Sequence, residues 1–272
     1  MSAVDELFQR LRSRGTKAFM PFVTAGDPDL AFTVEILREF AAAGCHMCEL
    51  GIPYSDPIAD GPVVQASFTR ALDRGIRLSR IFDTAAQLLP TLSMPIVTMV
   101  SYSIVHRQGL ESYVKRAKAA GFAGAIIPDL LVDEAPPLAR ICRREDFSLI
   151  QLVTPTTPRD RALRIIESST GFLYYVSVTG ITGERKELPP ELVENVSELR
   201  RETNLPICIG FGISRPEHVR KLAPVADGLI VGSAIVRRIA EIKQDDRSAV
   251  LHEVRRYVDE LIGAISSGDG KL

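Results

Sequence analysis

Two carboxylic acids, Glu49 and Asp60, flank a short proline-rich segment that directly follows an apolar run. Glu49 lies within that run, between Met47 and Leu50, where an unpaired carboxylate would cost on the order of several kcal/mol. An apolar environment disfavours the charged form of a carboxyl group, so the pKa of Glu49 should rise toward the range in which it can donate and accept a proton. Asp60 follows a loop stiffened by prolines, as is common for loops that carry function on a rigid scaffold. The pair therefore predicts general acid-base chemistry.

Each acid also has a structural interpretation. Glu49 could be an ion-paired or solvent-facing acid at the end of a strand. Asp60 could be the N-cap of a helix that begins after Gly61. The residues alone give no preference between the structural and the catalytic interpretation.

Two glycine-containing segments late in the chain could hold an anion. Residues 209–214 read IGFGIS and residues 231–235 read VGSAI, and each places glycines before a predicted helix. Free backbone N–H groups and the helix dipole favour anions there, and phosphate sites in barrels often follow the seventh and eighth strands. Arg215 stands where a dinucleotide fingerprint would need its third glycine, so a Rossmann site is not expected. Glycines that only permit tight turns are the structural alternative.

The other reactive side chains form no recognisable metal or nucleophile motif. Cys45 and Cys48 have CxxC spacing, but in a continuous strand they would point to opposite faces, and no second ligand cluster is present. The four histidines fit no metal-ligand spacing, and no serine or cysteine lies in a nucleophile elbow. We therefore expect no metal or redox site and no covalent intermediate.

Eight apolar runs, separated mostly by amphipathic segments, supply the elements that would position these side chains. Alternating strands and helices imply parallel strands, and eight units spaced roughly thirty residues apart favour a closed (β/α)8 TIM barrel, an α/β fold. The expected strands are 18–24, 46–51, 95–100, 124–127, 149–153, 172–176, 206–209 and 228–231, and the expected crossover helices are 30–43, 111–120, 133–144, 159–168, 190–202 and 215–222.

Further helices complete the expected single domain of residues 1–272. Residues 1–15 predict an N-terminal helix with Leu7, Phe8 and Leu11 on one face, which would plug the barrel floor. Two short helices, 63–72 and 78–89, would follow the second strand. A long helix, 250–265, would precede a frayed tail at 266–272.

The composition excludes several classes of function. The 33 basic and 34 acidic residues leave a formal net charge of −1, so no global field attracts nucleic acid or an acidic membrane. The first residues lack the pattern of a signal peptide, and no apolar run approaches the ~18 residues of a membrane span. Four cysteines fit reduced thiols better than a disulfide framework. We expect a cytoplasmic protein with local phosphate recognition.

The segment 51–62, which reads GIPYSDPIADGP, closely resembles the hallmark loop of the tryptophan synthase alpha subunit. The resemblance extends over essentially the whole chain. It implies a TIM barrel that cleaves indole-3-glycerol phosphate to indole and glyceraldehyde 3-phosphate by a retro-aldol reaction, with Glu49 and Asp60 as the catalytic pair and no cofactor. It also implies a partner, the pyridoxal-phosphate-dependent beta subunit, in an alpha2-beta2 complex that makes tryptophan.

The same resemblance implies roles for residues around the substrate. Thr182 would position the Asp60 carboxylate, and the Gly183 amide would face the phosphate. Residues 179–188 would form a lid, because their glycines free the backbone and residues 184–187 have no apolar anchor. In full, the resemblance places Phe22, Tyr174, Thr182 and Phe211 around the substrate and Gly183, Gly212, Gly232 and Ser233 around the phosphate.

One stretch departs from the family pattern. Many relatives carry a Tyr-Tyr-Asn-Pro-like stretch after the third strand, whereas residues 101–104 of this chain read SYSI. We expect residues 101–106 to form a loop near the partner subunit, together with the loop 53–62. The departure therefore concerns the contacts of this loop, including those toward a partner subunit.

Two rival functions fit parts of the pattern. One is a subunit with little activity of its own that activates the beta subunit, and the other is an indole-glycerol phosphate synthase on the same fold. Retention of both acids argues against the first. The second would be expected to use a catalytic lysine, and none of the expected strand ends carries one.

Overall fold

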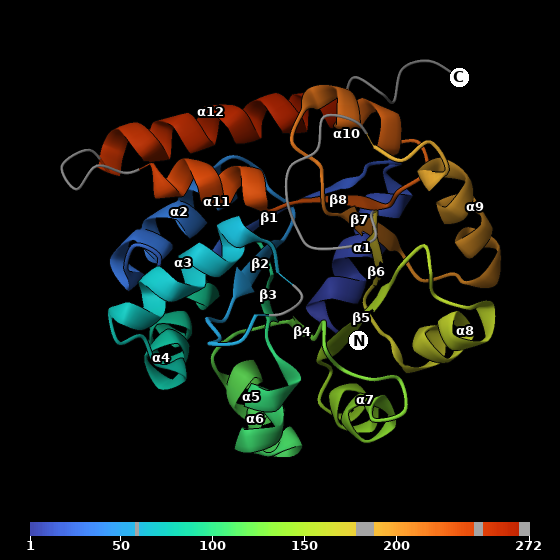
Figure 1. Ribbon diagram of the computed structural model, residues 1–272, viewed down its shortest axis with the longest axis horizontal. Helices are drawn as coiled ribbons and strands as arrows, with labels where there is room; N and C mark the ends of the chain where they lie inside the picture. Colours follow the sequence, from blue (N-terminus) through green and yellow to red (C-terminus); the bar gives the residue numbers. More distant parts are fainter. Residues whose placement is uncertain (58–59, 178–187, 242–246, 267–272) are drawn as a thin grey trace.

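The eight strands of the computed structural model are parallel and close into a barrel in sequence order, with β8 pairing back to β1. The structure describes residues 1–57, 60–177, 188–241 and 247–266. Figure 1 shows the helices arranged around the strands. The closed barrel confirms the expected TIM architecture. Its strands are β1 (Ala18–Thr24), β2 (Cys48–Gly51), β3 (Ile96–Met99), β4 (Gly124–Ile126), β5 (Ser148–Val153), β6 (Leu173–Val176), β7 (Ile207–Gly210) and β8 (Gly228–Val231).

The helices cross back over the outer face of the barrel. In the described ranges they are α1 (Ala3–Ser13), α2 (Leu30–Ala42), α3 (Pro62–Asp73), α4 (Leu78–Leu88), α5 (Tyr102–Gln108), α6 (Leu110–Ala119), α7 (Ala135–Arg144), α8 (Arg159–Ser168), α9 (Leu192–Glu202), α10 (Pro216–Leu222), α11 (Ser233–Ala240) and α12 (Arg247–Ser266), with a 3-10 turn, η1 (Leu89–Thr91), after α4. The expected elements are present, with ends shifted by a few residues. None of these helices, as far as the structure describes them, has the length and apolar character to cross a membrane.

The stretch expected to be a loop after the third strand forms helix α5 instead. Ser101 is its N-cap and accepts a hydrogen bond from the Ser103 amide. Asp129, which follows β4, accepts hydrogen bonds from the Ser101 hydroxyl and the Tyr102 amide, both at 2.7 Å. The helix ends at Gly109, whose φ of 82° suits glycine. Asp129, at the end of another strand, thus stabilises the start of a helix that the residues of α5 themselves favour only weakly.

Side chains alternate along each strand, so one strand supplies two cores. In β1, Phe22 belongs to the inner core of the barrel, whereas Phe19 belongs to the outer core beneath the helices. Helix α1 packs on the inner core, with the rings of Phe8 and Phe172 5.7 Å apart. Because Phe172 precedes β6, α1 closes the N-terminal floor, as expected. The C-terminal ends of the strands are left to carry the site.

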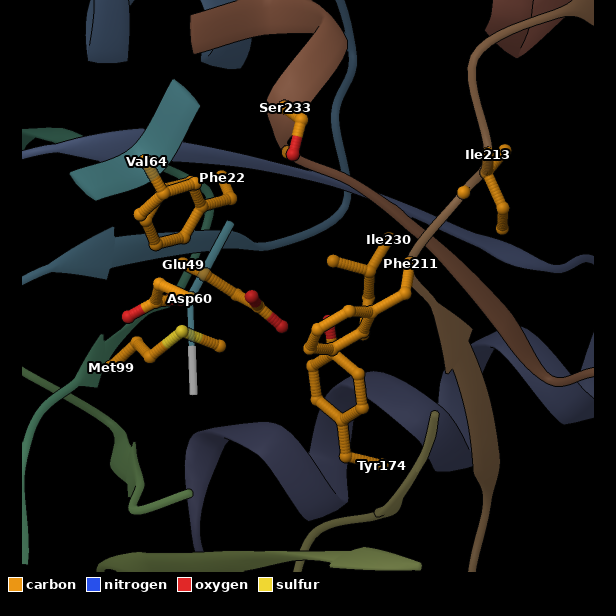
Figure 2. A pocket seen from close by; sticks show the side chains of 12 residues that line it. Phe22, Glu49, Asp60, Val64, Met99, Tyr174, Phe211, Ile213, Ile230 and Ser233 are labelled. Atoms are coloured by element: carbon orange, nitrogen blue, oxygen red, sulfur yellow. The ribbon is translucent and has the colours of Figure 1, made fainter. Parts of the chain in front are cut away.

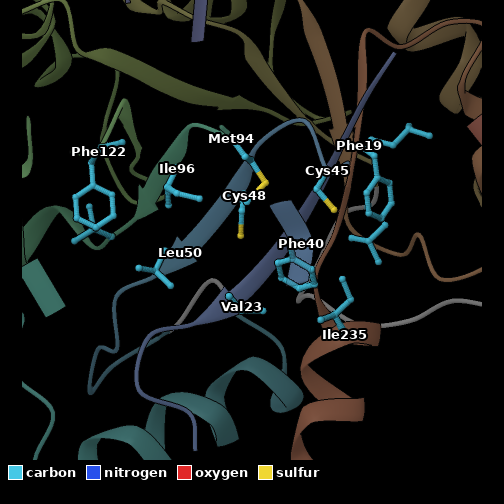
Figure 3. Packing of buried hydrophobic residues seen from close by; sticks show 14 of the residues in the cluster. Phe19, Val23, Phe40, Cys45, Cys48, Leu50, Met94, Ile96, Phe122 and Ile235 are labelled. Atoms are coloured by element: carbon cyan, nitrogen blue, oxygen red, sulfur yellow. The ribbon is translucent and has the colours of Figure 1, made fainter. Parts of the chain in front are cut away.

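The outer core holds both cysteines of the CxxC spacing (Figure 3). Because β2 begins at Cys48, Cys45 lies ahead of the strand, and both side chains enter the same cluster. The expectation that they point to opposite faces is therefore wrong. Both thiols are free and buried. Among the residues that the structure describes, no group of three or more acidic, histidine or cysteine side chains is placed to hold a metal ion.

Candidate active site

Glu49 points into the barrel from the middle of β2. Alternation sends Met47 to the inner core and Cys48 and Leu50 to the outer core, so Glu49 faces inward. It pairs with Phe22 of β1 on one side and Val97 of β3 on the other. The Glu49 side chain is fully buried. This burial excludes the interpretation of Glu49 as a solvent-facing acid.

The Glu49 carboxyl group has no polar partner within the described ranges. Neither of its oxygen atoms accepts or donates a hydrogen bond there. Burial raises the pKa of Glu49 well above its ordinary value. Burial thus favours the neutral, protonated form of the group, which is the form that can donate a proton.

Asp60 lies at the end of the loop that follows β2, one residue ahead of the α3 N-cap. Its backbone amide donates to the Pro57 carbonyl at 3.1 Å, and the Gln65 side chain donates to the Asp60 carbonyl at 2.7 Å. Gly61, and not Asp60, is the N-cap of α3. The N-cap interpretation of Asp60 is therefore wrong, and its carboxylate instead lines a pocket with Glu49.

The surroundings of Asp60 separate its pKa from that of Glu49. Burial, followed by the negative charge of Asp129, raises the pKa of Asp60 to about 6. Asp129 lines a second cavity that adjoins the pocket and shares Asp60 and Met99 with it. Asp60 is thus mostly ionised at neutral pH, whereas burial shifts Glu49 toward its protonated form. One neutral acid and one carboxylate face a single pocket.

Aromatic rings from three strand ends form the walls of this pocket. Phe22 comes from β1, Tyr174 from β6 and Phe211 from the turn after β7. The Tyr174 and Phe211 rings meet edge to face, with centroids 5.7 Å apart and planes at 77°. In Figure 2 the Glu49 carboxyl group lies with the Phe211 and Tyr174 rings on one side of it and Asp60 on the other. A flat apolar ligand would fit between such walls.

Two glycines at strand ends make room for the rings. A Cβ atom at Gly51 would lie 2.6 Å from the Phe22 ring, and one at Gly210 would lie 2.1 Å from the Tyr174 hydroxyl. Side chains do not tolerate contacts that short, so both positions require glycine. Sequence reasoning missed this role, although a glycine inside a strand is a signal for close approach.

The glycine segments after β7 and β8 meet at the rim of the same pocket. Gly212, Gly232 and Ser233 all line it. Gly232 is the N-cap of α11, and its carbonyl group accepts hydrogen bonds from the Ile235 and Val236 amides. The amides of Ser233 and Ala234, which come before these, are the ones that helix geometry leaves without a partner inside the helix. Such a helix start favours an anion. The rim therefore offers a place for a phosphate group above the acids.

The pocket has an empty volume of about 460 Å³, including its open mouth. Of the residues singled out from the sequence, it brings together Phe22, Glu49, Asp60, Tyr174, Phe211, Gly212, Gly232 and Ser233. It also contains Val64, Met99, Ile213 and Ile230, which sequence reasoning did not identify. Met99 and Ile230 could have been predicted, because side chains alternate along a strand and both residues face inward near the ends of their strands.

Two of the residues implied by the resemblance, Thr182 and Gly183, lie outside the described residues, as does the expected lid up to residue 187. The last residue of that segment, Leu188, is buried in the outer core. The roles of Thr182, Gly183 and the lid stay predictions.

Comparison with known proteins points to one family. The family model for the tryptophan synthase alpha chain matches residues 8–265. A tryptophan synthase alpha chain from Rhodopirellula baltica is 56% identical over 263 residues, which cover 96% of this chain and 95% of that protein. The one from Arabidopsis thaliana is 38% identical, with 97% and 96% covered.

Solved structures give the same result. The alpha subunit from Legionella pneumophila superposes with a TM-score of 0.88 at 31% identity, covering 98% of this chain and 99% of that one. A chain from a structure of Mycobacterium tuberculosis tryptophan synthase also gives 0.88, at 28% identity, with 97% and 98% covered. The likeness thus spans the whole barrel.

Proposed function

The chain belongs to the tryptophan synthase alpha chain family, and we propose that Glu49 and Asp60 perform its reaction. The enzyme is a carbon-carbon lyase that cleaves indole-3-glycerol phosphate to indole and glyceraldehyde 3-phosphate in tryptophan biosynthesis. The observation that carries our assignment is the buried, unpartnered carboxyl group of Glu49 in a pocket shared with Asp60. The fold and the family leave the residue roles open, and these are the subject of the proposal.

The first step is protonation of the indole ring. The bond between ring carbon C3 and the glycerol side chain breaks only after C3 has become tetrahedral, and this requires a proton. The neutral Glu49 carboxyl group donates that proton. The positive charge then resides on the ring nitrogen, where ionised Asp60 accepts the N–H hydrogen bond and stabilises it.

The second step is cleavage. Glu49, now a carboxylate, removes the proton from the side-chain hydroxyl next to C3. The electron pair of the breaking carbon-carbon bond returns to the ring and neutralises it, while the hydroxyl carbon becomes the aldehyde. Glu49 ends protonated, so it acts as both acid and base in one cycle. Two carboxyl groups with separated pKa values divide the work.

We propose that the rest of the pocket orients the substrate. Phe22, Tyr174 and Phe211 would hold the indole ring, and Gly212, Gly232 and Ser233 would bind the phosphate with backbone and hydroxyl donors. By family resemblance alone, Thr182 would orient Asp60 and Gly183 would add a further donor. This placement puts the phosphate at the rim and C3 near Glu49.

The family implies a beta-chain partner. We propose that the complex is alpha2-beta2, that the beta chain carries pyridoxal phosphate, and that the loop around Asp56 and helix α5 lie near it. We also propose a cytoplasmic location, which the four free, buried cysteines support.

An assay of the purified chain tests the proposal. Indole and glyceraldehyde 3-phosphate should appear in equal amounts from indole-3-glycerol phosphate, with a higher rate after the cognate beta chain is added. A chain that binds the beta chain and releases no indole under either condition would be an activator without the proposed chemistry.

A further inference from the structure

Ser177 joins two of the strand ends that form the pocket. It follows β6 directly and is fully buried. Its backbone amide donates to the Gly210 carbonyl at 3.2 Å, and its hydroxyl donates to the Phe211 carbonyl at 2.5 Å. Ser177, directly after β6, therefore holds the carbonyl group of the last residue of β7 and that of Phe211, the first residue of the turn after it.

That turn has a backbone conformation that needs support. Phe211 and Gly212 both have φ of 74°. Glycine adopts this left-handed region freely, whereas a bulky residue such as phenylalanine rarely does. Such strain persists only where the surroundings determine the conformation. The Ser177 hydroxyl is a direct restraint of this kind, because it fixes the carbonyl group of the strained residue.

The turn supplies two parts of the pocket. Its conformation places the Phe211 ring against Tyr174 and brings the Gly212 backbone to the pocket rim. A relaxation of Phe211 to negative φ would rotate the ring and shift the following amide. Substrate binding would suffer, because both contacts come from the turn.

We propose that Ser177 is a positioning residue for substrate binding, acting through the left-handed Phe211–Gly212 turn. The inference rests on the proposed phosphate site at the rim. Among the described residues, Ser177 makes its hydrogen bonds to Gly210 and Phe211 and none to either acid. Glu49 and Asp60 come from β2 and its loop, at a different part of the wall. Loss of the hydroxyl therefore weakens binding more than it slows chemistry.

The test uses Ser177→Ala and, as a milder change, Ser177→Cys, whose thiol is a weak donor. We expect the dissociation constant for glycerol phosphate and the KM for indole-3-glycerol phosphate to rise about tenfold in the alanine variant, since a hydrogen bond to a buried carbonyl is lost. The kcat should stay within about threefold, because the acids keep their places. The cysteine variant should be intermediate.

Ser148→Ala is the matched control, because Ser148 is also a buried serine but bonds to the Ser2 hydroxyl at the barrel floor. It should leave glycerol phosphate binding unchanged. In a Phe211→Gly background, where the turn needs no restraint, Ser177→Ala should add less than about twofold.

The outcomes separate this inference from the proposed function. Folded Ser177→Ala or Ser177→Cys with wild-type affinity overturns the positioning role. So does an undiminished effect in the Phe211→Gly background, since Ser177 would then act by another route. A wild-type chain that binds no glycerol phosphate overturns the phosphate site itself, and this inference with it.

Discussion

The floor and the mouth of the barrel surround a carboxyl group in opposite ways. At the floor, Asp227 accepts hydrogen bonds from Arg12 and from the Ile207 amide and pairs with Arg200. Burial alone would raise the pKa of Asp227, but these partners lower it. At the mouth, Glu49 has no polar partner in the described structure, and burial raises its pKa.

This difference separates stability from reactivity. The floor acid is charged and ties α1, α9 and the start of β7 together. At the mouth, burial favours the protonated form of Glu49, which can donate its proton. An unpaired buried polar group costs stability, so a fold keeps one only where it serves another purpose. We therefore expect substitution of the mouth acid to reduce activity without lowering stability, and substitution of the floor acid to lower stability without reducing activity.

The largest expected effect is at the mouth. Glu49→Gln should reduce kcat by about 10³-fold or more, because the amide keeps the shape of the acid and cannot transfer a proton. Its unfolding free energy should not fall, since no hydrogen bond of the described residues is lost. Indole release and chemical denaturation measure the two quantities. A variant within tenfold of wild-type activity would remove the acid-base role.

Asp60→Asn should have the next largest effect. It removes the charge that faces the ring nitrogen, and we expect kcat/KM to fall about 10²-fold. Binding of glycerol phosphate serves as the control, because the rim does not involve Asp60. If that binding fell in parallel with kcat/KM, the variant would have disturbed the pocket rather than its charge.

At the floor the signature should reverse. Asp227→Asn should lower the unfolding free energy by about 1–2 kcal/mol, a loss limited by the partial exposure of both arginines. The folded variant should cleave substrate at the wild-type rate. Urea denaturation and a steady-state assay test the pair of expectations. A loss of activity in Asp227→Asn without a loss of stability would contradict the claim that the floor acid serves stability and the mouth acid serves catalysis.

The smallest expected effect is on the pH profile. Asp60 must be ionised, and its pKa is about 6, so kcat/KM should fall as the pH drops below that value. Asp129→Asn removes a negative charge that raises this pKa. The acid limb should then move to lower pH, by less than about one unit. A limb that moves upward, or does not move, would show that Asp129 does not act on Asp60.

The two acids and the barrel fold could be predicted from the sequence because each is indicated by residues close together in the chain. Glu49 interrupts the second apolar run. The glycines of residues 209–214 and 231–235 directly follow the seventh and eighth apolar runs. The apolar runs themselves also recur with the spacing of strand-helix units. None of these signals depends on what lies across the barrel.

The features that sequence reasoning missed depend on neighbours distant in the chain. Helix α5 was expected to be a loop because its cap acceptor, Asp129, comes from another strand end. The need for glycine at 210 follows only from the Tyr174 ring on the next strand. The expectation for Cys45 assumed a continuous strand from residue 45 to residue 48, whereas β2 begins at Cys48. The first two features depend on contacts with residues distant in the chain, whereas the third depends on where one strand begins.

The central claim is that Glu49 is protonated in the resting pocket at neutral pH. Carbon-13 NMR of protein labelled at the glutamate carboxyl carbons, titrated from about pH 4 to about pH 9, would test it directly, with Glu49→Gln assigning the signal. We predict that one glutamate signal keeps the shift of a protonated acid through neutral pH while the others ionise. A Glu49 signal that titrates near the ordinary value of about 4.3 would contradict the account.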